Sequence, residues 1–238
     1  QAENEAPIAL QVNGESPDAL ARAARESGAL LIHYSTDYVF AGTGTRAWQN
    51  TDPVDPQNVY GQSKLAGERA IAEAGGDWLV FRTSWVYAAR GKNFVRTMLK
   101  LGAEREILRV VADQIGAPTS ARLIADATAQ ALAVAMAERH SGRFKSEVHH
   151  LCASGSTSWH GFAQRLFERW RAVAPHAPLA LRTLEAIPSS DYPTPARRPL
   201  NSRLDCAPFE DRFGLALPPW QQGLEAVLQE LAGALTAR

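Results

Sequence analysis

Short apolar runs alternate with segments of helical periodicity along the first part of the chain. The runs Ala29–Thr36 and Trp78–Arg82 are of strand length and nearly continuous in apolar residues, which is typical of strands buried in a parallel sheet. The first run follows a helical pattern that starts at Pro17, with Ser16 as the expected N-cap and Gly28 as the expected stop. This alternation predicts an α/β fold built on a doubly wound parallel sheet.

After Gly142 the predicted helices and strands no longer alternate regularly, and irregular segments separate them. We therefore expect residues 1–142 to form one domain and residues 143–238 to form mostly a smaller lobe, with an approximate boundary and interleaved segments. The other expected elements are strands at Ile107–Val111 and Val148–Leu151, helices at Tyr60–Ala74, Asn93–Leu101, Leu123–Met136, Trp159–Val173 and Trp220–Leu235, and a Pro-rich irregular stretch at Ile187–Pro199.

Composition excludes several classes of protein. Lys+Arg 25 and Asp+Glu 25 balance, so no electrostatic footprint for nucleic acid or membrane is indicated. Cys152 and Cys206 match no metal or redox spacing and read as buried small residues in a reducing compartment. No apolar run reaches membrane-spanning length, and no signal peptide is recognised. We expect a cytoplasmic protein without nucleic-acid or membrane partners.

Tyr60 and Lys64 stand four residues apart at the head of an expected helix. This spacing places a phenol and an ammonium on one helical face. An ammonium near a phenol favours the phenolate and lowers its pKa from about 10, which suits a general acid at neutral pH. Alone the pattern is weak, because any surface helix can carry such a pair.

Polar and aromatic residues follow the two apolar runs. Thr36 and Asp37 end the first run, and Trp85 follows the second. Because carboxyl ends of parallel strands meet at one edge of a sheet, these residues and the head of the Tyr60 helix should converge. Tyr60 could then protonate a substrate carbonyl oxygen, Thr36 could hold that oxygen, and Lys64 could also bond a cofactor ribose. The hydride must come from a nicotinamide, since no side chain carries one.

Five ordered motifs carry a resemblance to a known family. Ser35–Phe40 and Tyr60–Glu68 resemble the extended short-chain dehydrogenase/reductase superfamily, and Phe81–Tyr87, Asp113–Thr119 and Pro195–Pro199 narrow the resemblance to the dTDP-4-dehydrorhamnose reductases. The resemblance covers essentially the whole chain. The ordered set is specific, although each motif alone is not.

The resemblance implies a Rossmann-like sheet, with residues 1–142 as part of a dinucleotide-binding domain and residues 143–238 as mostly a substrate-binding lobe. It implies an oxidoreductase that uses NADPH or NADH to reduce the C4 keto group of dTDP-4-dehydro-L-rhamnose to dTDP-L-rhamnose, a precursor of lipopolysaccharide O-antigen. The implied site residues are catalytic Thr36, Tyr60 and Lys64; cofactor-binding Asn13, Ser35, Tyr60, Lys64 and Ser84; and substrate-binding Thr36, Asp37, Tyr38, Trp85 and Arg197. For Arg197 there is an alternative to substrate binding, since an arginine in a Pro-rich loop could equally bind backbone carbonyl groups as a structural residue.

Alternatives within and outside the enzyme class stay open. Some relatives of this fold are non-catalytic regulatory subunits that bind a dinucleotide. Others are nucleotide-sugar epimerases or dehydratases. Dehydratases need an acidic residue beside the catalytic hydroxyl, and Asp37 directly after Thr36 keeps that alternative open. Some family members form homodimers with Mg²⁺ held by glutamates. Arg122 stands where an acidic residue would suit such a site, so we expect no metal, while a homodimer remains open.

The chain departs from the family in one respect. It has no Gly-x-x-Gly-x-x-Gly fingerprint, and Gly42-Thr43-Gly44 lies in the loop before Tyr60. The chain therefore reads as starting after two βα units and a third strand, on the order of 60 residues. A fragment or a late-start gene prediction fits the intact triad better than a degenerate copy. We expect the intact parent to be active and the 238 residues alone to bind NADPH poorly or not at all.

Three histidines are expected to be structural. His33 lies inside the first strand and is expected to be packed and hydrogen-bonded rather than a ligand. His149 and His150 are adjacent on a strand, so their rings should point to opposite faces, which makes a metal site improbable.

Overall fold

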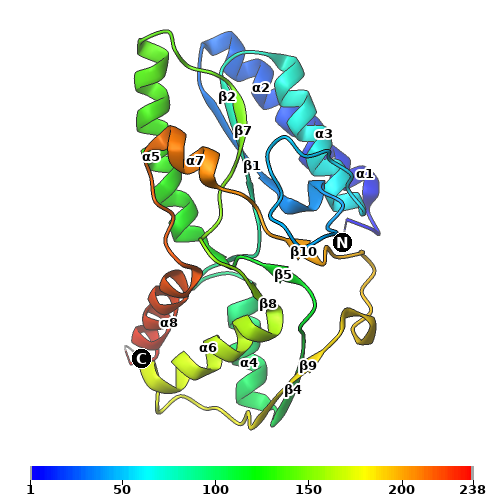
Figure 1. Ribbon diagram of the computed structural model, residues 1–238, viewed down its shortest axis with the longest axis vertical. Coiled ribbons are helices and arrows are strands. Elements are labelled where there is room, and N and C mark those ends of the chain that lie inside the picture. The colour runs from blue at the N-terminus through cyan, green and yellow to red at the C-terminus, as the bar shows by residue number, and fades with distance from the viewer. Residues whose placement is uncertain (1, 237–238) are drawn as a thin grey trace. The chain divides into compact units, whose positions relative to one another are not determined.

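The computed structural model describes residues 2–236, which form two compact units, each assembled from three segments of the chain (Figure 1). Helices and parallel strands alternate, which confirms the α/β class. The two units, defined by contacts between residues, do not meet at a single boundary near residue 142. The assignment of the cofactor to one domain and of the substrate to the other stays a prediction. Unit 1 comprises residues up to Ser84, Ala127–Leu151 and Thr194–Ala216, and unit 2 comprises Trp85–Asp126, Cys152–Pro193 and the residues from Leu217.

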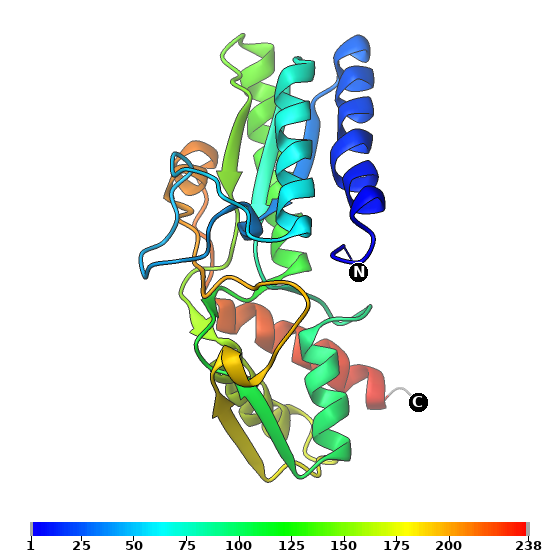
Figure 2. The ribbon, with the colours of Figure 1, turned by 90° about the vertical axis from the view of Figure 1, so that its right-hand side faces the viewer.

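The sheet of unit 1 has the order β1-β2-β7, with all neighbours parallel. Central β2 (Trp78–Thr83) is buried along nearly its whole length, whereas β1 (Leu31–Thr36) is half-buried until its last two residues. Helices α2 and α3 pack against the sheet side by side (Figure 2). The remaining elements of unit 1 are α1 (Ala6–Leu10), η1 (Gln11–Glu15), α2 (Ser16–Ser27), η2 (Asp37–Val39), α3 (Val59–Ala74), β7 (Glu147–His150), β10 (Asn201–Ser202) and α7 (Ala207–Phe213).

One expectation about the first helix was wrong. Ser16 is not an N-cap, because α1, the π-helical turn η1 and α2 run on without a break and Ser16 Oγ donates to the Gln11 carbonyl at 3.0 Å. Pro17 has no backbone N–H to continue the regular ladder, so the turn before it is wider. The expected stop is confirmed: Gly28 caps α2 in the left-handed conformation, with φ 65°.

The strand predicted at Val148–Leu151 is present as β7 (Glu147–His150), and it belongs to unit 1. It pairs in parallel with β2 from Leu79↔Glu147 to Arg82↔His150. Its two histidines are fully buried, His149 at 1% and His150 at 0% exposure. The sequence predicted this strand, but its pairing with β2 depends on the fold and was not predicted.

The helix that carries Tyr60 starts and ends where the sequence indicates. Asn58 is the N-cap of α3, its side chain accepting a hydrogen bond from the Gly61 N–H at 2.8 Å, and Gly75 ends the helix. At Gly61 the helix passes so close to Tyr38 that an added Cβ would lie 2.2 Å from the Tyr38 carbonyl oxygen. Glycine is thus required there for the end of β1 and the head of α3 to meet.

We expect Gly61→Ala to destabilise unit 1 by about 1–3 kcal/mol, the range for overpacking, because a carbonyl oxygen of the main chain cannot move as a flexible side chain can. Gly233→Ala is the matched control, since nothing lies within 4 Å of a Cβ added there. Alanine is the better helix former, so this control should stabilise α8 by up to about 1 kcal/mol. Urea unfolding measures both changes, and equal effects would contradict the close approach.

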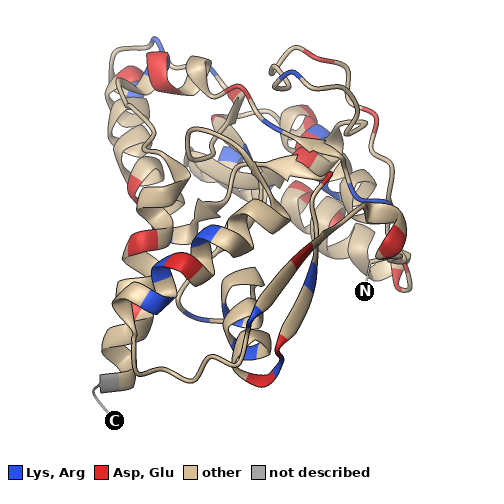
Figure 3. Ribbon diagram, turned by 60° about the horizontal axis from the view of Figure 1, so that its bottom comes forward, with Lys and Arg blue, Asp and Glu red and all other residues tan. Residues whose placement is uncertain are grey.

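Unit 2 has its own apolar core. Helix α6 contributes Phe162, Leu166, Phe167 and Trp170, which were expected to lie on one face and are buried together. Lys and Arg are interspersed with Asp and Glu over the elements rather than gathered on one of them (Figure 3), in keeping with the zero net charge. The elements of unit 2 are β3 (Val86–Tyr87), α4 (Phe94–Glu104), β4 (Ile107–Val111), β5 (Ile115–Gly116), β6 (Thr119–Ser120), β8 (Thr157–Ser158), α6 (Trp159–Val173), β9 (Thr183–Ile187), η3 (Ser189–Asp191) and α8 (Trp220–Thr236), and α5 (Ala121–His140) begins here and continues in unit 1.

Candidate functional site

Thr36 and Tyr60 meet where the carboxyl end of β1 faces the start of α3. The Thr36 hydroxyl is close enough to the Tyr60 phenol to lower its pKa in part. Thr36 Oγ1 also donates to Asp37 Oδ1 at 3.1 Å and accepts from the Tyr38 N–H at 3.2 Å. Thr36 is 5% exposed and Tyr60 is 37% exposed, so Tyr60 is the more accessible of the two residues. The structure thus brings two of the three predicted catalytic side chains into direct contact.

The expected effect of Lys64 on the Tyr60 phenol is wrong for this structure. Burial raises the pKa of Tyr60, the hydrogen bond from Thr36 lowers it in part, and the charge of Asp37 raises it. Lys64 is not among these influences, because its ammonium is turned to β1, where Nζ donates to the Tyr34 carbonyl at 2.6 Å. The helical spacing correctly placed Tyr60 and Lys64 on one face of α3. It could not show that the Tyr34 carbonyl of β1 accepts a hydrogen bond from the Lys64 ammonium.

Lys64 is itself buried, with 9% of its surface exposed. Besides the Tyr34 carbonyl, Nζ contacts His33 Nε2 at 2.9 Å. Burial lowers the pKa of Lys64, and the negative charge of Glu68 opposes this effect. His33 is therefore packed and hydrogen-bonded, as expected from the sequence, but its partner is the predicted catalytic lysine.

Asp37 and Tyr38, both predicted to line the substrate pocket, are next to Thr36. Burial raises the pKa of Asp37 to about 6, although hydrogen bonds from Ser202 and Thr36 oppose the rise. Burial and the nearby Asp37 raise the pKa of Tyr38 to about 12. The Tyr38 and Tyr60 rings pack edge to face, with centroids 5.6 Å apart. Ser202, which the sequence analysis missed, lies in β10, far away in the sequence.

Arg197 belongs to an exposed loop that the Tyr60 helix holds in place. Buried Asn58, the cap of α3, donates from Nδ2 to the Arg197 carbonyl at 2.9 Å, and the Arg197 guanidinium donates to Gln57 Oε1 at 3.3 Å. The neighbouring Arg198 was missed, yet its charge acts on the Tyr38 phenol and lowers its pKa in part. The sequence did contain a signal for Arg198, because the Pro-Ala-Arg-Arg-Pro motif has two adjacent arginines and either could have been proposed as the substrate-binding residue.

The other predicted site residues are spread over the fold. Asn13 Nδ2 donates to Ser63 Oγ at 3.1 Å, which ties η1 to α3. Ser35 and Ser84 are buried at 5% and 3% exposure. Trp85 begins unit 2, where its ring stacks on Trp159 with centroids 3.6 Å apart. The cofactor and substrate roles of these residues stay predictions.

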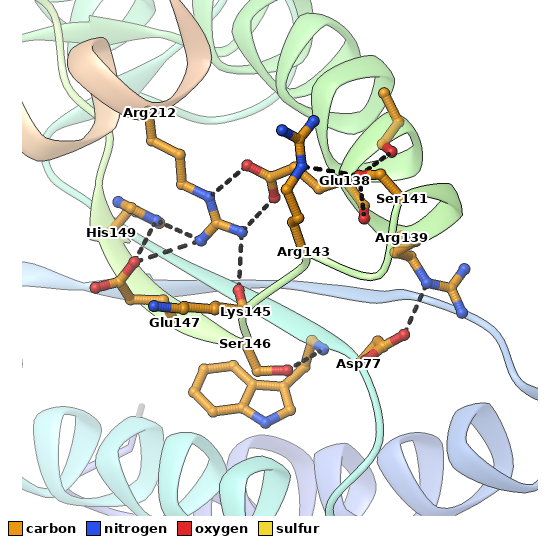
Figure 4. Close-up of polar contacts among 12 residues, drawn as sticks. Asp77, Glu138, Arg139, Ser141, Arg143, Lys145, Ser146, Glu147, His149 and Arg212 are labelled. Carbon is orange, nitrogen blue, oxygen red and sulfur yellow. Dashed lines mark hydrogen bonds and ion pairs between the residues drawn. The ribbon is translucent and has the colours of Figure 1, made fainter.

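A separate polar cluster surrounds Arg212 of α7 (Figure 4). Its guanidinium donates to Glu138 Oε2 at 2.7 Å and to the Lys145 carbonyl at 2.8 Å, and it contacts His149 Nε2 at 3.2 Å. Burial and the charge of Arg212 lower the pKa of His149 to about 4. This cluster fastens α7 and α5 to β7.

Three buried histidines predict how stability depends on pH. Burial lowers the pKa of His33 and His149 to about 4 and that of His150 to about 3, from 6.5. Below pH 6.5 the unfolded chain therefore binds protons that the folded chain does not, and the free energy of unfolding falls as the pH falls. Asp37, with its pKa raised to about 6, has the opposite effect, but it is one group against three. The urea midpoint should drop between pH 7.5 and pH 5; a constant midpoint would contradict neutral buried histidines.

Neither a membrane-spanning helix nor a metal-binding cluster is found in the described part of the chain. Among residues 2–236, no helix has the length and hydropathy that a membrane span requires. Within that same range, no cluster of three or more His, Cys, Asp or Glu side chains could hold a metal ion.

The chain is similar to proteins of one named family. Residues 1–232 match the family model described as RmlD substrate binding domain. Two relatives named dTDP-4-dehydrorhamnose reductase are 54% identical (Burkholderia thailandensis; 97% of this chain, 77% of the relative) and 50% identical (Escherichia coli K12; 97% and 75%). The crystal structure of a dTDP-4-dehydrorhamnose reductase from Bacillus anthracis in complex with NADP has a TM-score of 0.85 at 32% identity, covering 97% of this chain and 76% of that one. The chain therefore belongs to the RmlD substrate-binding-domain family of dTDP-4-dehydrorhamnose reductases.

Proposed function

We propose that this chain carries the proton-donating site of an NADPH-dependent oxidoreductase that reduces the C4 keto group of dTDP-4-dehydro-L-rhamnose to dTDP-L-rhamnose. The observation that carries the proposal is that the end of β1 brings the Thr36 hydroxyl to the Tyr60 phenol, with Lys64 one helical turn further on. The relatives named for this reaction supply the substrate class, and the relative solved with NADP supports NADPH as the cofactor.

Tyr60 acts as the general acid. Because burial raises its pKa, the phenol keeps its proton at neutral pH. As the substrate carbonyl is reduced, its oxygen becomes an alkoxide that is far more basic than a phenolate, so the proton moves from Tyr60 Oη to that oxygen. Thr36 holds the same oxygen by turning its hydroxyl hydrogen from Asp37 to the substrate, as a positioned donor aimed at developing charge.

The residues present fit the ribose end of a nicotinamide cofactor. Lys64 Nζ has three N–H groups, of which the Tyr34 carbonyl and His33 take two, so one remains for a ribose hydroxyl. Bound NADPH supplies the hydride. Ser35, Ser84 and Asn13 are proposed to line this end of the cofactor. The 238 residues contain no Gly-x-x-Gly-x-x-Gly turn, so we assign none of them to the pyrophosphate.

The substrate side of the site is proposed to comprise Asp37, Tyr38, Trp85 and Arg197. Tyr38 packs against the Tyr60 ring, and the charge of Arg198 acts on the Tyr38 phenol. Two adjacent guanidinium groups suit a diphosphate, which they can bind in a fork-like geometry. We therefore propose that the loop with the double arginine faces the phosphates of the nucleotide sugar.

The test is an absorbance assay on the gene product that contains these residues, with NADPH and dTDP-4-dehydrorhamnose. We expect the absorbance of the reduced nicotinamide to fall. Constant absorbance with tight dinucleotide binding would instead support a non-catalytic regulatory subunit. Conversion of the sugar nucleotide without net oxidation of NADPH would support an epimerase or dehydratase. A cytoplasmic location and a homodimer remain predictions, and size-exclusion chromatography would test the second.

A further inference from the structure

We propose that His33 is a positioning residue that orients the ammonium group of Lys64 through a neutral imidazole ring. The two side chains come from β1 and α3, and their nitrogen atoms are 2.9 Å apart. The Tyr34 carbonyl, one residue further along β1, accepts from the same ammonium at 2.6 Å. Two adjacent residues of one strand therefore hold the end of a side chain that is 9% exposed.

Alternation along β1 explains this arrangement. Successive strand side chains point to opposite faces of the sheet. The Tyr34 side chain points to α5, where its hydroxyl donates to Thr128 Oγ1 at 2.8 Å. The His33 ring consequently points to α3 and reaches Lys64, while the Tyr34 carbonyl stays in the plane of the strand.

The hydrogen bond dictates the protonation of His33. An ammonium group has three donors and no acceptor, so Nε2 of His33 must be the acceptor. An acceptor nitrogen carries no proton, so the neutral ring must hold its proton on Nδ1. Burial and the charge of Lys64 lower the pKa of His33 to about 4, in agreement with a neutral ring at working pH.

A neutral acceptor has a specific advantage at this position. The acidic side chain whose charge acts on Lys64, that of Glu68, lies one turn further on in α3 and is engaged by Arg82, at 2.6 and 3.0 Å. A carboxylate in place of His33 would neutralise the ammonium and compete with a ligand for it. The imidazole restrains the flexible lysine stem and leaves both the positive charge and one N–H available.

The first test is the tautomer of His33, read by ¹⁵N NMR of the uniformly labelled protein, with His33→Gln identifying the resonance. We expect a neutral ring protonated on Nδ1 at pH 7. In Lys64→Met, which removes the donor, the proton should be free to move to Nε2. An imidazolium, or a proton on Nε2 in the unaltered protein, would overturn the proposal. This readout does not depend on enzymatic activity.

The second test is kinetic and rests on the proposed function. The Gln amide oxygen can reach the position of Nε2, whereas Asn reaches only that of Nδ1 and Leu has no acceptor. We expect His33→Asn and His33→Leu to raise KM for NADPH by about 10–100-fold, as for a lost hydrogen bond to a charged group, and His33→Gln to stay within about threefold. Thermal unfolding compares the folding of the three variants. Equal KM values in all three would overturn the proposal. Absence of reductase activity in the unaltered protein would overturn the proposed function, and the tautomer would then decide the role of His33.

Discussion

Replacing Tyr60 with phenylalanine is expected to lower kcat by about 10²–10⁴-fold, the range for a positioned proton donor. The substitution removes one oxygen atom, and with it both the acid and the polar neighbour of the Thr36 hydroxyl. The ring remains, so its edge-to-face contact with Tyr38 is kept. KM for the sugar nucleotide should therefore change much less than kcat. Steady-state kinetics with varied sugar nucleotide separates the two parameters.

Tyr87→Phe is the matched control for this substitution. The Tyr87 ring is buried in unit 2, and its hydroxyl has no hydrogen-bond partner within residues 2–236. Removing that hydroxyl should leave kcat unchanged and should not reduce stability, because a buried unpaired polar group is costly to keep. If Tyr60→Phe turned over as fast as Tyr87→Phe, Tyr60 would not be the acid.

Replacing Arg82 with methionine is expected to destabilise unit 1 by about 3–5 kcal/mol, the cost of leaving a buried charge unpaired. Arg82 of β2 and Glu68 of α3 form a two-pronged ion pair at 2.6 and 3.0 Å, and each is 5% exposed. The guanidinium also lies over the Phe40 ring, 5.0 Å from its centroid. The ion pair therefore joins the Tyr60 helix to the centre of the sheet, and urea unfolding measures its loss.

Two further variants test whether the stability lost in Arg82→Met comes from leaving a buried charge unpaired. The double variant Glu68→Leu with Arg82→Met should recover much of the lost stability, since no charge is then buried alone. Arg165→Met breaks the surface pair with Glu168, whose side chains are 40% and 62% exposed, and should cost at most about 0.5 kcal/mol. An Arg82→Met variant as stable as Arg165→Met would contradict the buried ion pair.

Local sequence signals were sufficient for the elements around the site. Continuous apolar residues identified β2 because it is buried on both faces. The polar end of β1 and the head of α3 were recognisable from Thr36 and from the spacing of Tyr60 and Lys64, and the structure brings Thr36 and Tyr60 together. Each of these features depends on residues that are close in the sequence, which explains why a single sequence was enough.

Features that depend on distant parts of the chain could not be predicted. The orientation of Lys64 depends on a strand carbonyl 30 residues earlier. The pKa of Asp37 is lowered in part by Ser202, which belongs to a short strand near the other end of the chain. β7 pairs with β2, a strand more than 60 residues earlier, and this pairing buries the polar side chains of His149 and His150. No periodicity in the sequence records such contacts.

The backbone of Trp85 is a third kind of feature that the sequence concealed. Its φ of 50° is the only positive value for a residue other than glycine among residues 2–236. A bulky residue adopts this conformation only where its surroundings impose it, and such strain clusters at functional sites. Gly116 packs directly against the Trp85 ring, where an added Cβ would lie 2.6 Å from a ring atom. This strain supports the proposed role of Trp85 in the substrate pocket.

The most direct test of the reductase site follows deuterium from NADPH, labelled at the nicotinamide C4 position on the transferred face, into the sugar nucleotide. For the gene product that contains these residues, we predict deuterium at C4 of the dTDP-L-rhamnose product. We further predict that Tyr60→Phe slows this incorporation by the same factor as kcat. Product without deuterium at C4, or incorporation at an unchanged rate in Tyr60→Phe, would contradict reduction at the site formed by Thr36, Tyr60 and Lys64.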